Sequence, residues 1–126
     1  MKHLLLALAI LAVSLGFCIF VTCYVRTCAE EAAQPLARAK ALAAQDDFDG
    51  AAEAVAEAQR RWHNSSRWLE LMLPHDEADE ASRIFAALYE YALLQDGDDF
   101  AASCAELEFQ LAHIRQMQLP TPQNIL

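Results

Sequence analysis

Hydrophobic and polar residues are unevenly distributed along this chain, and the first 26 residues differ from all the others. No charged side chain occurs in the 22 residues from Leu4 to Val25, which are mostly aliphatic and lie between Lys2 and Arg26. As a helix this run is ~33 Å long, enough to cross the hydrocarbon core of a bilayer. A secretory signal peptide has a shorter apolar region of roughly 7–15 residues. The pattern therefore predicts an uncleaved transmembrane anchor over residues 1–26.

The charges that flank the apolar run give a weak orientation signal. Lys2 and the amino terminus lie on one side, while Arg26 on the other side is followed by Glu30 and Glu31. Positive residues near a span tend to stay in the cytoplasm, and acidic residues count for little. We expect a single-pass protein of the cell membrane, with a cytoplasmic N-terminus and the rest of the chain outside.

Beyond the apolar run, hydrophobic positions recur every three or four residues, as in amphipathic helices. This period predicts helices over residues 27–45, 47–73, 76–94 and 98–117. Pro35 leaves two possibilities for the first of them. Either the membrane helix continues outward and kinks at Pro35, or a new helix starts with Pro35 in its first turn.

The predicted fold is therefore all-α: one transmembrane helix followed by a small antiparallel helical bundle. A short acidic turn with an aromatic residue and alanines occurs at residues 47–52 and again at 98–102. A helix-hairpin repeat has this appearance, and a simple antiparallel bundle explains it equally well. We expect an anchor at 1–26, an extracytoplasmic helical domain at 27–117 and a Pro-containing tail at 118–126.

The composition narrows the possible partners of the extramembrane part. All 18 acidic residues lie beyond residue 26, with only seven of the nine basic ones. Nucleic acid binding needs a basic surface, so this class is excluded. The expected partners are the lipid bilayer and another membrane or envelope protein. Most apolar residues here are alanine, which favours helix but buries little area, so the core must be thin.

One segment is dense in side chains that bind metal ions: His75, Asp76, Asp79 and Glu80. On a helix His75 and Asp79 share a face, as do Asp76 and Glu80. Such a group can hold a divalent cation loosely. Acidic residues are also favourable in the first turn of a helix because of its dipole, and this explanation is the simpler one.

Catalytic and cofactor motifs are not recognisable in the chain, so we expect no enzyme and no cofactor. Cys104 and His113 fall on one predicted helix, more than ~13 Å apart along its axis, which excludes a nucleophilic dyad. Cys104 lies on the apolar stripe and is expected to be a buried thiol. Cys28 and Cys104 are expected at opposite ends of the bundle, too far apart for a disulfide.

Basic and aromatic residues occur together only at Arg60–Leu69. Arg and Trp are frequent at binding hot spots and at membrane interfaces. Trp62 falls on the apolar stripe and is expected in the core, whereas Trp68 is expected on the surface. Since the second extramembrane helix returns toward the bilayer, we predict an interaction surface there, formed by Arg60, Arg61, Arg67 and Trp68.

Several features follow one another in an order typical of a known family. They are the N-terminal span, the turn at residues 47–51, Trp62, the His and acidic residues of 73–80, the Gly97-Asp98 turn with its helix, and the terminal residues 124–126. The chain resembles the small anchored proteins of spore-forming Gram-positive bacteria that are grouped as domain of unknown function 4363. It departs from that pattern at Pro74, which precedes His75. The resemblance implies a bacterial cell membrane and transfers no catalytic residue.

These observations together predict an anchored interaction or scaffold subunit for another membrane or envelope protein. The alternative is an extracytoplasmic sensor domain that binds a ligand or a divalent metal ion through the segment around His75.

Overall fold

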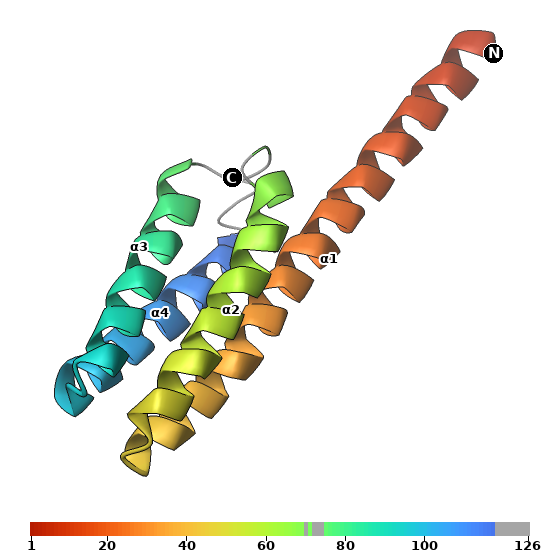
Figure 1. The fold of residues 1–126 in the computed structure, drawn as a ribbon. Coiled ribbons are helices and arrows are strands. Elements are labelled where there is room, and N and C mark those ends of the chain that lie inside the picture. The colour runs from red at the N-terminus through yellow and green to blue at the C-terminus, as the bar shows by residue number, and fades with distance from the viewer. Residues whose placement is uncertain (70, 72–74, 118–126) are drawn as a thin grey trace.

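The computed structural model describes residues 1–69, 71 and 75–117, and these ranges contain helices and turns but no strand. The helices are α1 (Lys2–Ala44), α2 (Phe48–Leu69), α3 (His75–Leu93) and α4 (Gly97–Met117). Each helix runs antiparallel to the one before it, and α4 packs against α3 and α1 to close the bundle (Figure 1). The predicted all-α fold with an antiparallel bundle is confirmed. The predicted tail, 118–126, lies outside the described residues.

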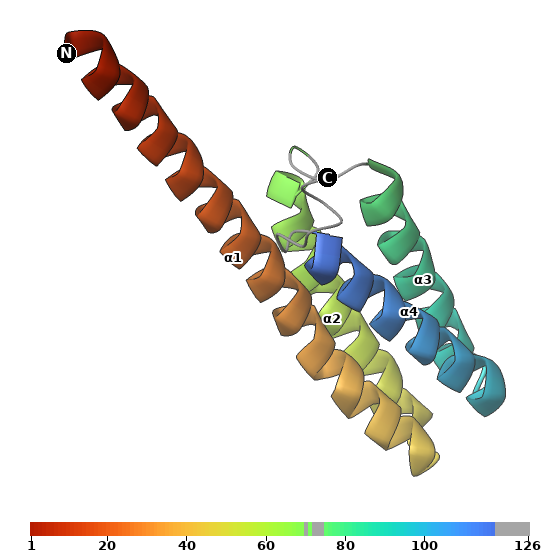
Figure 2. The ribbon, with the colours of Figure 1, turned by 180° about the vertical axis from the view of Figure 1, so that it is seen from behind.

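The first helix is a single element that includes both the apolar run and the first bundle helix. It continues for 43 residues with Pro35 in its interior. Figure 2 shows the apolar part projecting from the bundle as a continuation of the same rod. The possibility that a new helix starts at Pro35 is therefore wrong. Among the described helices, α1 alone is long and apolar enough to cross a membrane; its most apolar 18-residue window has a mean hydropathy of 2.9 and is not buried.

Small side chains join α1 to α2. Buried residues alternate at spacings of three and four, the pattern of a coiled-coil seam. They are Val25, Cys28, Ala32, Pro35 and Ala39 on α1, and Ala51, Val55, Ala58 and the one large residue, Trp62, on α2. Alanine lets two helix backbones approach closely, which is how an alanine-rich hairpin packs tightly.

Larger side chains fill the space between this hairpin and the other two helices. The period of three or four residues predicted from the sequence is confirmed for α3 and α4, where the residues at this spacing are buried: Ala78, Ala81, Phe85, Leu88, Ala92, Phe100, Cys104, Leu107, Leu111 and Ile114. The second helix ends at Leu69, earlier than the predicted residue 73, and Leu71 already lies in a turn.

The turns after α1 and after α3 are built alike, at the end of the bundle far from the apolar segment (Figure 1). Asp46 and Gln95 hold the left-handed backbone position that ends each helix, with φ of 60° and 57°. The carboxylates of Asp47 and Asp96 then accept the N–H three residues ahead, at 3.1 and 3.2 Å, and cap the next helix. Asp47 thus corresponds to Asp96, so the second turn begins two residues before residue 98, where the sequence pattern placed it.

Candidate functional site

The C-terminal end of α2 lies beside the last turns of the apolar segment. The hydroxyl of Tyr24 donates a hydrogen bond to the carbonyl of Ser65 at 3.3 Å, and Val21 packs partly buried against the core. Since α1 and α2 are antiparallel, residues after Ser65 lie beside residues before Tyr24. Trp68 and Leu71 therefore lie at the level of the apolar run, with 62% and 78% of their surface exposed.

Arg61, one of the four predicted interaction residues, is engaged within the bundle. Its guanidinium pairs with Glu57 at 2.6 Å, and the other oxygen of Glu57 accepts a 2.6 Å bond from Arg38 of α1. The hydrogen bond from Arg38, followed by the charge of Arg61, holds the pKa of Glu57 below its ordinary value. Arg61 therefore joins α2 to α1 instead of facing outward.

The same arginine explains how α1 accommodates a proline. Pro35 has no N–H, so the carbonyl of Glu31, four residues earlier, loses its helical hydrogen bond. A guanidinium nitrogen of Arg61 donates to this carbonyl oxygen at 3.4 Å. The chain thus supplies from α2 a donor for a carbonyl that the proline leaves without one.

The other three predicted interaction residues border two shallow hollows on α2. Arg60 lines a hollow of about 360 Å³ between α2 and α3, together with His63, Asn64 and Ser82. Asn64 also lines a second hollow, of about 410 Å³, with Arg67, Trp68 and Leu71. No acidic residue is among the described residues that line either hollow. The two hollows form one surface along α2 that leads toward the apolar segment.

Trp62 and Trp68 occupy the environments expected from the sequence. Trp62 is 1% exposed and its ring lies 6.4 Å from that of Phe85, whereas Trp68 is on the surface. The indole N–H of Trp62 is buried without a hydrogen-bond partner among the described residues. Trp62 is therefore a core residue that also borders the hollow beside Arg60.

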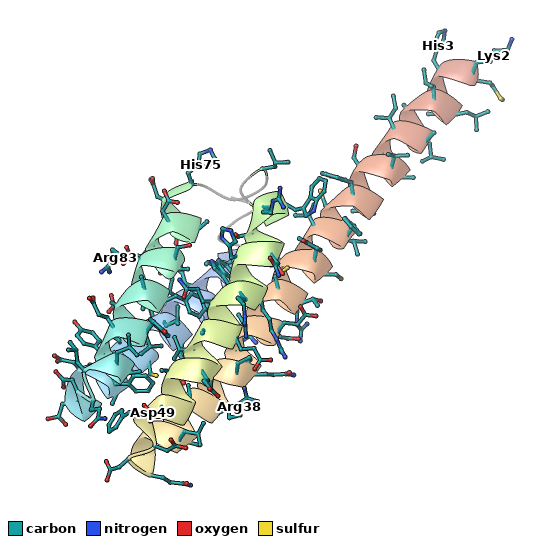
Figure 3. All side chains as sticks on the ribbon, viewed as in Figure 1. Lys2, His3, Arg38, Asp49, His75 and Arg83 are labelled. Atoms are coloured by element: carbon teal, nitrogen blue, oxygen red, sulfur yellow. The ribbon has the colours of Figure 1, made fainter. Side chains whose placement is uncertain are left out.

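The predicted metal-binding segment forms the start of α3. His75, Asp76 and Asp79 are exposed, and His75 projects from the free end of the helix (Figure 3). Within 1–69, 71 and 75–117, no three His, Cys, Asp or Glu side chains are grouped closely enough to hold a metal ion. Asp76 lies in the first turn, where the helix dipole favours a negative charge.

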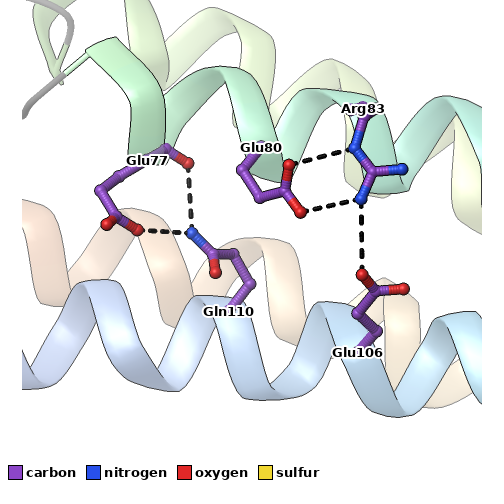
Figure 4. A network of polar contacts seen from close by, with 5 residues as sticks. All are labelled: Glu77, Glu80, Arg83, Glu106 and Gln110. Atoms are coloured by element: carbon purple, nitrogen blue, oxygen red, sulfur yellow. Dashed lines mark hydrogen bonds and ion pairs between the residues drawn. The ribbon is translucent and has the colours of Figure 1, made fainter.

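Glu80, the fourth of the predicted metal-binding residues, and Glu77 beside them instead belong to a polar network between α3 and α4 (Figure 4). Glu80 accepts two hydrogen bonds from Arg83, at 2.8 and 3.0 Å, and these hold its pKa below the ordinary value. Arg83 also reaches Glu106 of α4 at 3.4 Å. Glu77 accepts a 2.7 Å bond from the amide of Gln110. These contacts link α3 to α4, a role that helical spacing alone did not indicate.

The two cysteines of the bundle are free thiols at different heights. Cys28 is buried near Tyr24 and Ser65, and Cys104 is buried near Lys40 and Glu108. Burial is the main cause that raises the pKa of Cys104, to about 11. The prediction that these cysteines do not pair is confirmed, as is the burial of Cys104.

Fold and surface together define an up-and-down four-helix bundle whose first helix extends into a long, exposed apolar segment. The chain belongs to the family described as domain of unknown function (DUF4363), whose model matches residues 19–125. This range contains the whole bundle and the end of the apolar segment. No curated protein and no solved structure matches the chain.

Proposed function

We propose that this chain is a membrane-anchored interaction or scaffold subunit, with its N-terminus in the cytoplasm and its bundle outside. The observation that carries the proposal is the continuity of α1, which passes from the apolar segment into the bundle within one 43-residue helix. At ~1.5 Å per residue this rod is ~65 Å long. Without a linker, the orientation of the bundle is tied to that of the span, as a scaffold for a neighbouring membrane protein requires.

An exposed aromatic residue outside the predicted membrane depth supports a protein partner. Phe109 of α4 is 73% exposed and stacks on His113, with ring centroids 6.4 Å apart. Its neighbour Glu108 pairs with Lys40 at 3.6 Å, which places this part of α4 beside the outer half of α1. Aromatic side chains are enriched in protein interfaces, so we propose this face of α4 as the contact for a partner.

Purification of the full chain from its native membranes in mild detergent tests the proposal. We expect one membrane or envelope protein in comparable amount, reduced at least fivefold by Phe109→Ala. Leu93→Ala is the matched control, because Leu93 is a large apolar residue of α3 that is 59% exposed. Recovery of the chain alone would contradict the proposal.

The alternative, a metal-binding sensor, has its own readout. A ligand that binds only the folded state raises the melting temperature. A rise in melting temperature with one divalent cation, abolished by His75→Ala, would favour the sensor.

Protease added to intact, wall-stripped cells tests the topology. An intact bundle after this treatment would contradict the proposed orientation.

A further inference from the structure

We propose that one face of α2 binds the headgroup of an anionic phospholipid. This surface, called the lipid face below, consists of Arg60, Asn64, Arg67 and Trp68 of α2, with Leu71 in the turn that follows. The inference rests on the proposed function, because it requires α1 to cross the membrane. It adds a specific ligand class for the end of the bundle nearest the bilayer.

Helical spacing puts these residues on one side of α2. Positions 60, 64, 67 and 68 fall within about 100° of one another around the axis of α2, and Leu71 lines the same hollow as Arg67 and Trp68. Asn64 belongs to both hollows, which makes them one continuous surface. Arg60 and Arg67 are seven residues apart, or ~10.5 Å along the axis. A phospholipid headgroup that lies along the helix can span this distance, whereas a single small ion cannot.

The register with α1 places this face at the depth of lipid headgroups. The bond between Tyr24 and Ser65 puts Arg67 beside the end of the apolar run, and Arg60 about two turns farther out. The headgroup layer is roughly 5–7 Å thick on each side of the hydrocarbon core. The long side chain of Arg67 extends outward to reach this layer, and that of Arg60 extends back toward the bilayer. Both guanidinium groups are therefore within reach of phosphates.

Charge favours an anionic occupant on this face. Within the part of the chain that is described, Arg60 and Arg67 have no acidic partner, whereas Arg61 and Arg83 are both paired. The whole chain carries a formal charge of −9. An anionic membrane therefore repels most of the bundle and attracts this face. Guanidinium groups bind phosphate through paired hydrogen bonds, which makes the attraction specific.

The apolar end of the lipid face is suited to contact an acyl chain of the ligand. Trp68 and Leu71 expose 62% and 78% of their surface at the level of the apolar run. Trp is favoured where headgroups meet acyl chains, because its ring is apolar and its N–H is polar. Free phosphate would leave both side chains uncovered. A ligand with an anionic head and an acyl chain covers the basic part and the apolar part together.

Native mass spectrometry of the full chain in detergent tests the lipid face. The protein is mixed with equal amounts of phosphatidylglycerol and phosphatidylcholine, and the retained lipids are counted. We expect at least a fivefold preference for phosphatidylglycerol in the natural chain and none in the double variant Arg60→Gln, Arg67→Gln. The matched control is Lys40→Gln with Arg83→Gln, which removes the same charge from other faces. Circular dichroism verifies that each variant is folded.

The outcomes test the lipid face independently of the proposed function. Equal retention of the two lipids, or an unchanged preference in the double variant, would overturn the lipid face. Displacement of phosphatidylglycerol by 10 mM inorganic phosphate, at an ionic strength matched with sodium chloride, would identify an ion site and also overturn it. If the double variant keeps its lipid preference but loses a co-purified protein, this face binds protein instead. Loss of the partner upon Phe109→Ala is measured separately and does not depend on these results.

Discussion

The hydrogen bond from Arg61 to the carbonyl of Glu31 matters only because residue 35 is proline, and this dependence can be measured. The variant Arg61→Met keeps most of the side-chain stem and removes the guanidinium. In the natural chain it loses both the bond to Glu31 and the pair with Glu57. In the Pro35→Ala background, the N–H of the new alanine bonds to Glu31, so only the pair with Glu57 is lost.

The free energy that the bond from Arg61 to Glu31 contributes can be estimated from its geometry. Hydrogen bonds to charged groups contribute about 1.5–3 kcal/mol. The bond is long, at 3.4 Å, and the Arg61 side chain is 42% exposed, so we expect about 1 kcal/mol for this bond. The contribution of Glu57 is the same in both backgrounds and cancels in a double-mutant cycle. Pro35→Ala alone should stabilise the bundle, since proline inside a helix costs up to ~3 kcal/mol.

Thermal unfolding of the full chain in detergent, followed by circular dichroism, supplies the four stabilities of the cycle. A coupling of about 1 kcal/mol corresponds to roughly 4–8 °C in melting temperature for a domain of this size. Arg61→Met should therefore lower the melting temperature distinctly less in the Pro35→Ala background than in the natural chain. Equal losses in the two backgrounds would refute the reasoning, because they would mean that the bond to Glu31 contributes nothing.

Three further predictions concern the core, the turn after α3 and a buried thiol. Trp62→Ala should lower the melting temperature by more than about 10 °C, because removing a buried aromatic side chain costs ~3–5 kcal/mol. Trp68→Ala should change the melting temperature by less than about 2 °C, and similar losses for both variants would contradict the assigned burial. Gln95→Gly should stabilise the bundle by about 1 kcal/mol in urea unfolding, because glycine takes the left-handed backbone without strain, and a loss of stability would count against that explanation. Peptide mapping after iodoacetamide treatment at pH 8 should find Cys104 unmodified in the folded protein and modified after denaturation, because burial and a pKa of about 11 keep it a protonated thiol; labelling of the folded protein would contradict this.

Periodicity made most of the fold predictable from the sequence. Hydrophobic spacing identified the buried faces of α3 and α4, because these faces pack against large neighbours and must be apolar along their length. It left the junction at Pro35 open, since the local sequence fits both a continuous helix and a new one. The residue that partly compensates for the proline, Arg61, is distant in sequence and acts on a backbone carbonyl. No side-chain pattern records such a contact.

The sequence predicted the interaction surface only as a stretch of neighbouring residues on α2. Arg60, Arg61, Arg67 and Trp68 were predicted together because they are close in sequence. In the structure their side chains point in different directions. Arg61 turns toward α1, whereas the other three line the hollows on α2. Arg60 and Arg61 point about 100° apart as consecutive helical residues, and Arg61 is on the side of α2 that contacts α1. The direction of each depends on where α1 and α3 pack, which composition does not specify.

Helix lengths explain why the lipid face lies where it does. In the proposed topology α1 leaves the bilayer near Arg26 and ends at Ala44, while α2 starts at Phe48 and continues to Leu69. The returning helix is longer than the emerging part of α1, so its last turn passes Arg26 and lies beside the end of the apolar run. The residues before Val21 are all exposed, but as a helix from Leu4 they extend only ~25 Å, less than the roughly 30 Å of a hydrocarbon core. A span this short is accommodated when the residues that follow it also enter the bilayer. In this topology Val21 and Tyr24, which are partly buried against the bundle, also enter the bilayer, and Arg67 and Trp68 lie at the membrane surface.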